Sequence, residues 1–200
     1  MYKFLTTILF ILLAFISIPA FAGDDRIKFV GSIGVSGGGE KMYTGQYTDG
    51  STFDIKAGGG IYINAGISYV VDPDFDIQTT LGYHTDSTSA DNGNISFDRV
   101  PLEAVLFYNF VESKVKFGIG LRKSLSAKTK TTGIAADLKA YSFNSSLGQV
   151  IELQYLFDKK AGANDQLALS LRYVSEYYKI NGYDKKIDGS HVGLALVYYN

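Results

Sequence analysis

Few residues of this sequence could carry out catalysis, because it has two histidines and no cysteine. His84 begins the stretch HTDS, which puts Asp86 and Ser87 close to it. A base, a nucleophile and an orienting acid are the elements of a hydrolase. In a strand, however, alternate residues point to opposite faces, so His84 shares a face with Asp86 but not with Ser87. His191 follows Ser190 near the end of another segment, and we expect no catalytic residue at either histidine.

Paired charges are the second kind of candidate site. The stretch VLFYNFVESKVKFGIGLRKS contains a tight turn at Glu112-Ser113, and counting back from that turn sets Glu103 opposite Arg122. A similar count in the next hairpin sets Glu152 opposite Arg172. All four side chains fall on the polar, inward face of their strands. We expect them to form ion pairs with a structural role, because an unpaired buried charge is costly.

The remaining motifs predict no cofactor and no metal site. Between two earlier strands, a plausible register sets His84 opposite Arg99 as a further inward polar pair. The Gly-Gly-Gly runs at 37–39 and 58–60 lack the Lys and the following helix of a phosphate loop. DNGN and DPDFD lack the spacing of a calcium loop. The formal net charge of −1 gives no reason to expect nucleic-acid binding.

These residues would be positioned by strands, since apolar and polar residues alternate with a period of two through most of the chain. High glycine (22) and tyrosine (15) with only 3 prolines also suit β-structure. Pro101 falls inside one strand and cannot donate a ladder hydrogen bond, so we expect a bulge or irregular pairing there. The expected strands lie near Arg26–Ser36, Gly58–Val71, Phe75–Asp86, Ile95–Phe110, Lys114–Ser124, Leu147–Asp158, Gln166–Tyr178 and Gly189–Tyr199.

The connections between these strands distinguish a membrane barrel from a soluble sandwich. Short turns, such as Asp72-Pro73-Asp74, alternate with long polar loops, such as 37–57 and 125–146. That alternation is typical of outer-membrane barrels. The apolar faces carry aliphatic residues in the middle and aromatic residues toward the ends, as at two membrane interfaces. The sequence therefore predicts an all-β fold, a closed antiparallel eight-stranded transmembrane β-barrel with a polar lumen.

The N-terminus, MYKFLTTILFILLAFISIPAFAG, has a short basic start, an apolar core and the small-x-small site Ala20-Phe21-Ala22. We interpret residues 1–22 as a cleaved signal peptide, with a retained membrane anchor as the alternative. Residues 23–200 would then form one outer-membrane β-barrel domain, exported through the periplasm.

The run LGYHTDSTSADNGNISFDRVPLEAVLFYNFVESKVKFGIGLRKSL resembles an outer-membrane β-barrel domain family of Gram-negative bacteria, of the small OmpA, OmpX and OmpW type. PLEAVLFYNF followed by KFGIGL carries most of the resemblance, and the strand plan covers essentially the whole mature chain. The resemblance implies the fold and an outer-membrane localisation. It implies no catalytic residues, because barrels of this group differ in role.

Three functions stay open from the sequence. The first is a structural or cell-surface interaction barrel with a plugged polar lumen, and not an enzyme. The alternatives are a narrow, porin-like or OmpW-like conduit for small solutes and a lipid A-modifying enzyme.

Expected partners are outer-membrane lipid and lipopolysaccharide, and the barrel-assembly machinery during biogenesis; we expect a monomer. Lysines of the predicted third loop could meet lipopolysaccharide phosphates or simply be solvated: Lys123, Lys128, Lys130 and Lys139.

Overall fold

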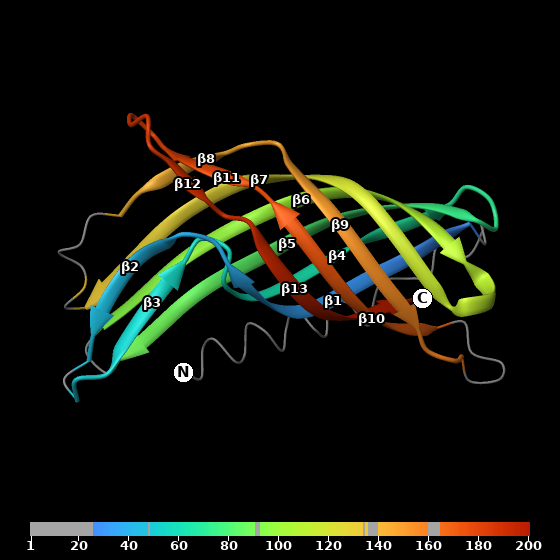
Figure 1. Cartoon of the computed structure of the whole chain (residues 1–200), viewed down its shortest axis with the longest axis horizontal. Helices are drawn as coiled ribbons and strands as arrows, with labels where there is room; N and C mark the ends of the chain where they lie inside the picture. Colours follow the sequence, from blue (N-terminus) through green and yellow to red (C-terminus); the bar gives the residue numbers. More distant parts are fainter. Residues whose placement is uncertain (1–25, 48, 91–92, 134, 136–139, 160–164) are drawn as a thin grey trace.

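Long antiparallel strands dominate the structure. The computed structural model describes residues 26–47, 49–90, 93–133, 135, 140–159 and 165–200. Eight strands of this described part form a barrel in the order β7-β6-β5-β4-β1-β13-β10-β9, and pairing of β7 with β9 closes it (Figure 1). The predicted all-β, closed antiparallel barrel is therefore confirmed. The barrel strands are β1 (Ile27–Gly38), β4 (Gly60–Val70), β5 (Phe75–Ala90), β6 (Gly93–Phe110), β7 (Val115–Gly133), β9 (Gly148–Leu156), β10 (Gln166–Ser175) and β13 (His191–Tyr199).

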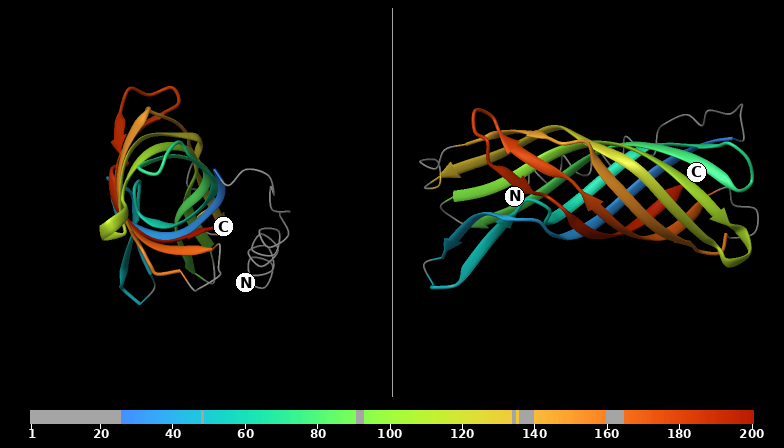
Figure 2. Two further views of the ribbon diagram at one scale, coloured as in Figure 1. Left: turned by 90° about the vertical axis from the view of Figure 1, so that its right-hand side faces the viewer. Right: turned by 45° about the horizontal axis from the view of Figure 1, so that its top comes forward.

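The two ends of the barrel differ. One end has short connections, among them the 3-10 turn η1 (Val111–Ser113) between β6 and β7. At the other end β5, β6 and β7 run on, and short strands prolong the sheet beside them (Figure 2). These are β8 (Ser142–Ser145), β11 (Tyr177–Ile180) and β12 (Lys186–Asp188), while β2 (Lys41–Gln46) and β3 (Thr52–Lys56) pair as a separate hairpin. We call this end, with its added strands, the extension.

The extension corrects two sequence predictions. The segment 125–146 was expected to be a loop, but β7 continues to Gly133 and β8 follows at Ser142–Ser145. The polar segment 37–57 was also expected to be a loop, but it contains the β2–β3 hairpin. The reason is the solvent: beyond the membrane a strand needs no apolar outer face, so its alternation is weak. The predicted signal peptide, residues 1–22, lies outside the described residues. Among the described residues, no helix is long and apolar enough to cross a membrane.

The hairpin of β6 and β7 keeps its predicted register although its turn is longer than predicted. Lys114 has the left-handed value φ = 58°, and Phe110 pairs with Val115, so four residues form the connection rather than two.

The structure also has the irregularity expected at Pro101. Val100 pairs with Ser126 and Pro101 with Ser124, which leaves Leu125 as an extra residue of β7.

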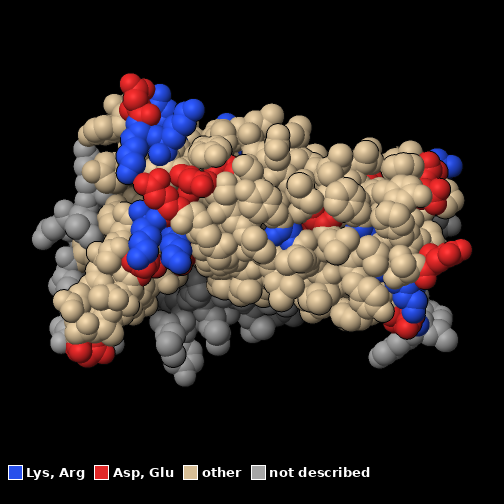
Figure 3. All heavy atoms as spheres, viewed as in Figure 1, with Lys and Arg blue, Asp and Glu red and all other residues tan. Residues whose placement is uncertain are grey.

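The outside of the barrel is a continuous apolar belt. Along β10, for example, Leu167, Leu169, Leu171 and Tyr173 are 43–51% exposed, and the residues between them are inward and largely buried. Aromatic side chains pack at one rim of the belt, where the rings of Phe75 and Tyr108 lie 5.1 Å apart. Figure 3 shows a middle that is mostly free of charged atoms, with Lys, Arg, Asp and Glu gathered at the two ends. Such a surface fits a lipid bilayer and not water.

Candidate functional site

The middle of the lumen holds a network of ion pairs centred on Glu103. Glu103 on β6 lies opposite Arg122 on β7, and Arg122 Nη1 is 2.5 Å from Glu103 Oε1. The second carboxylate oxygen, Oε2, is 2.6 Å from Arg172 Nη2 on β10. These three side chains are at most 5% exposed. One carboxylate therefore holds two guanidinium groups that come from different strands, β7 and β10, which β9 separates in the ring.

Glu152 and Arg172 lie opposite each other, as the register from the sequence had them, but they are not a close pair. Arg172 Nε is 3.8 Å from Glu152 Oε2. Glu152 instead accepts hydrogen bonds from Ser170 Oγ at 2.7 Å and from Gln154 Nε2 at 2.8 Å. The structure thus joins the two expected pairs into one network, in which Arg172 reaches across the lumen to Glu103.

Glu176 extends this network and was not singled out from the sequence. Its Oε2 is 2.9 Å from Arg122 Nε, and it accepts hydrogen bonds from the Tyr178 hydroxyl at 2.8 Å and from the backbone N–H of Ser124 at 3.1 Å. Glu176 has the same parity as the inward residues Arg172 and Val174, so the alternation of this strand could have identified it.

A second ion pair lies toward the end with the short turns. Lys116 Nζ is 2.8 Å from Asp76 Oδ1, and Ser68 donates a hydrogen bond to Asp76 at 2.8 Å. The ammonium also lies 5.0 Å from the ring centre of Phe107 and 4.8 Å from that of Tyr199. Hairpin counting missed this pair because β6 lies between β5 and β7, so the two residues meet only across the curved lumen.

The buried charges of the lumen balance. Among the described residues, the buried cations that face the lumen are four and so are the anions: Arg99, Lys116, Arg122 and Arg172 against Asp76, Glu103, Glu152 and Glu176. Six of these eight side chains form ion pairs within 2.9 Å, while Arg99 and Glu152 are held by hydrogen bonds to neutral groups. Pairing and hydrogen bonding offset the cost of placing an ion away from bulk water.

His84 and Arg99 pair in register but point to different partners. Arg99 is fully buried and donates hydrogen bonds to the carbonyl oxygens of Ala57 and, at 2.8 Å, of Gly59. It therefore ties the chain that returns from the β2–β3 hairpin into the mouth of the barrel. His84 turns instead toward β1, where its Nε2 lies 2.8 Å from Ser36 Oγ.

The tautomer of His84 is assigned from its contacts. Arg122 Nη2 lies 3.4 Å from His84 Nδ1, and a guanidinium can only donate, so Nδ1 accepts and the ring proton is on Nε2. Nε2–H then donates to Ser36 Oγ, which donates in turn to the carbonyl oxygen of Gly58 at 2.9 Å. A general base for Ser36 would need a lone pair at Nε2, so this arrangement is wrong for activating a nucleophile.

The HTDS residues themselves do not come together. Ser87 is exposed and pairs with Ser96, while Asp86 accepts a hydrogen bond from the backbone N–H of Lys56 at 2.7 Å. The rings of His84 and His191 lie 5.1 Å apart. In the described part of the chain, no group of three or more His, Cys, Asp or Glu side chains could hold a metal ion.

An apolar cluster lies above the ion pairs, toward the extension. We call it the upper apolar cluster. The Phe97 ring packs edge-on against Phe143 at 5.3 Å and Tyr178 at 5.2 Å, and the Arg99 guanidinium lies 4.9 Å from the Phe97 ring centre. The polar pairs in the middle of the lumen are thus covered by an apolar layer on the side of the extension. Its buried members are Ile55, Ala57, Ile95, Phe97, Ala127, Phe143, Tyr178 and Ile187.

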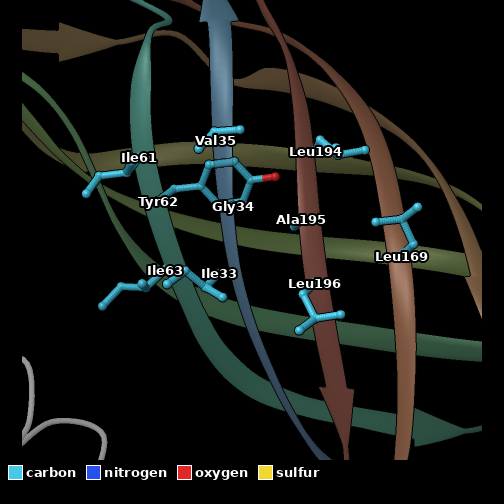
Figure 4. A pocket seen from close by; sticks show the side chains of 10 residues that line it. All are labelled: Ile33, Gly34, Val35, Ile61, Tyr62, Ile63, Leu169, Leu194, Ala195 and Leu196. Atoms are coloured by element: carbon cyan, nitrogen blue, oxygen red, sulfur yellow. The ribbon is translucent and has the colours of Figure 1, made fainter.

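A hollow of about 340 Å³ lies on the outer, lipid-facing wall, over Gly34 (Figure 4). Aliphatic side chains such as Ile61 and Leu194 border it, and the Tyr62 ring lies behind β1 as its floor. A Cβ on Gly34 would come within 2.6 Å of Tyr62 Cζ, so only glycine lets this ring fill the lumen at that level. The hollow is shallow and apolar, as a surface covered by acyl chains can be.

Comparisons with known proteins agree on the fold. No family model and no curated protein matches the sequence. The structure is similar to that of Ail, the attachment invasion locus protein of Yersinia pestis, in complex with the heparin analogue sucrose octasulfate, at 16% identity and a TM-score of 0.51, covering 86% of this chain and 99% of that one. A further match is Neisserial surface protein A, at 13% identity and a TM-score of 0.47, covering 88% of this chain and 96% of that one. Another is the outer membrane protein OprG from Pseudomonas aeruginosa, at 13% identity and a TM-score of 0.44, covering 86% of this chain and 94% of that one. At these identities the likeness establishes the fold alone, and of these three matches the one to Ail carries that argument.

The closed ring, the apolar belt and the polar, charge-paired lumen define the class of this protein: it is a small integral β-barrel of the outer membrane. The resemblance carried by PLEAVLFYNF and KFGIGL is confirmed at the level of the fold. The predicted outer-membrane localisation agrees with the closed barrel and its apolar belt.

Proposed function

We propose that this protein is a sealed barrel with a structural or cell-surface interaction role, and that the extension is its working part. The observation that carries the proposal is the network in which Glu103 of β6 holds Arg122 of β7 and, across the lumen, Arg172 of β10. An eight-stranded barrel has an interior just wide enough for its own side chains, so a network that spans it leaves little room for solutes.

The layers above and below the network support the same conclusion. Toward the short turns, Tyr199 is 4% exposed, and its hydroxyl donates to Gln154 Oε1 at 2.5 Å. Toward the extension, the upper apolar cluster excludes water. A conduit would need a continuous polar path, and Phe97, Phe107 and Val105 are at most 2% exposed along that path.

The shape of the extension supports a surface role. Strands β8, β11 and β12 continue the sheet from β7 by hydrogen bonds, and the separate β2–β3 hairpin contributes Ile55 to the upper apolar cluster. The extension is therefore a defined platform. Ail, which shares the fold, was solved with a soluble sulfated ligand. The tautomer of His84 supports a role other than catalysis.

Conductance in planar bilayers tests the sealed lumen. We expect the purified, folded chain to give no steady current steps in a membrane where a porin gives them. Glu103→Ala should raise the current by loosening the network, whereas Lys130→Gln on the outer face should leave it unchanged. Large, stable steps from the unmodified protein, scaling with salt concentration, would replace the sealed barrel by the conduit.

A further inference from the structure

The bulge at Pro101 determines which lysines of β7 face outward. Below it, Lys123 has the parity of the lipid-facing residues Ile119 and Leu121. Because Leu125 is an extra residue, the alternation shifts, and Lys128 and Lys130 face outward as well. With an unbroken alternation these two lysines would point into the interior.

The added strands bring two more lysines to the same surface. Ser142 on β8 pairs with Lys128 on one side, and the next outward residue of β8, Asn144, pairs with Lys179 of β11 on the other. Lys179 in turn lies directly opposite Lys186 of β12. We call the set the lysine strip: Lys123, Lys128, Lys130, Lys179 and Lys186.

The strip has more positive charge than its neighbours neutralise. Lys130 is paired with Asp98 at 2.6 Å and Lys179 with Asp184 at 2.7 Å. Among the described residues, Lys128 has no ion-pair partner. Within the described part of the chain, five lysines face three carboxylates, even with Asp188 at the far edge counted. Like charges placed opposite each other, as Lys179 and Lys186 are, destabilise a sheet. A bound anion would relieve that repulsion.

The surface just below the strip indicates which anion. Leu125 and Leu147, 61% and 64% exposed, and Tyr177, 47% exposed, form an apolar shelf that continues into the lipid belt. Lys123 interrupts this shelf, and its Nζ donates to the carbonyl oxygen of Ser145. Acyl chains could therefore lie on the shelf while an attached phosphate reaches the strip. A soluble polyanion would make no use of the shelf.

We propose that the lysine strip and the leucine shelf bind a phosphorylated glycolipid of the outer leaflet, with its phosphates at Lys128 and Lys179 and its acyl chains on Leu125 and Leu147. The site extends the proposed surface role by naming a partner. It does not require the lumen to be sealed, so bilayer conductance and lipid binding can fail independently.

Native mass spectrometry of the full chain in a mild detergent tests this site, with bisphosphorylated lipid A and the same lipid lacking both phosphates as probes. We expect the phosphorylated form to bind more tightly. A lysine near an anionic surface contributes about 1 kcal/mol, or about fivefold in affinity, so Lys128→Gln with Lys179→Gln should weaken binding roughly 25-fold. Lys28→Gln with Lys114→Gln, at the opposite end of the barrel, is the matched control and should change it little.

Three results would overturn the site. The first is equal binding of the two lipids, and the second is an equal loss of lipid A affinity in the strip variant and the control variant. The third is tight binding of sucrose octasulfate where lipid A does not bind, which would make the partner a soluble polyanion. Leu125→Gln gives an independent check, since it removes acyl contact but no charge. It should weaken binding of lipid A while every variant keeps the gel mobility of the folded barrel.

Discussion

Glu103 is the residue whose loss should disturb the lumen most, because two guanidinium groups depend on it. Glu103→Gln keeps the shape of the side chain and removes its charge, which leaves Arg122 and Arg172 with one carboxylate fewer. Breaking a buried ion pair by removing one partner costs about 3–5 kcal/mol. The amide oxygen can still accept one hydrogen bond, so we expect the free energy of unfolding to fall by about 3 kcal/mol.

The double variant tests whether the two residues act together. Arg122→Met alone leaves Glu176 with only neutral donors, the Tyr178 hydroxyl and the Ser124 N–H. Combining it with Glu103→Gln restores the charge balance of the lumen. The cost of the double variant should therefore be smaller than the sum of the single costs, by about 1–3 kcal/mol.

Equilibrium unfolding in urea, with the protein in lipid vesicles and linear extrapolation to water, gives these free energies. Lys130→Gln is the control, because an ion pair with a half-exposed lysine contributes about 1 kcal/mol or less. Single costs no larger than that of the control, or costs that add within about 0.5 kcal/mol, would refute the network as the element that holds the lumen together.

Three further predictions test other parts of the structure. Leu169→Arg, on the lipid face, should lower the free energy of unfolding by about 2–4 kcal/mol, whereas Thr132→Arg in the extension should cost little; equal costs would contradict the assigned faces. Gly34→Ala should cost about 1–3 kcal/mol, because its Cβ would lie 2.5 Å from a backbone oxygen, and Gly37→Ala, with nothing within 4 Å, should be near neutral in the same unfolding assay. Hydrogen bonds from Lys41 and Thr44 hold the pKa of Asp54 in the β2–β3 hairpin below its ordinary 3.8. The stability that these bonds add is therefore present above the pKa that Asp54 has in the unfolded chain, and it is lost as the pH falls through the pKa that Asp54 has in the folded chain. An NMR titration that placed the pKa of Asp54 at or above 3.8 would contradict these contacts.

Alternation made the membrane-spanning part of the fold predictable from sequence. Lipid outside and polar filling inside impose a period of two, and hairpin geometry then gives the partners of neighbouring strands. Glu103 lies opposite Arg122 because a turn connects their strands directly, and a longer turn of the same parity left that register unchanged. Pro101 indicated an irregularity for an equally local reason, its missing N–H.

Contacts across the lumen were not predictable in this way. Lys116 meets Asp76, Arg172 meets Glu103, and His84 meets Ser36 because the sheet closes on itself, and closure depends on the stagger of all the strands together. The extension was missed for a different reason. Outside the membrane neither face needs to be strongly apolar, so polar strands are difficult to distinguish from loops.

Water access to the middle of the lumen tests the sealed barrel most directly. The chain has no cysteine, so a single one can be introduced as a probe. Val150 points inward and is 1% exposed, and Ser142 is exposed in the extension. With the folded protein in vesicles and a charged thiol reagent on both sides, we expect Ser142→Cys to react and Val150→Cys to stay unmodified until urea unfolds the chain. Modification of Val150→Cys in the folded barrel at a rate close to that of Ser142→Cys would show a water-filled lumen and contradict the sealed barrel.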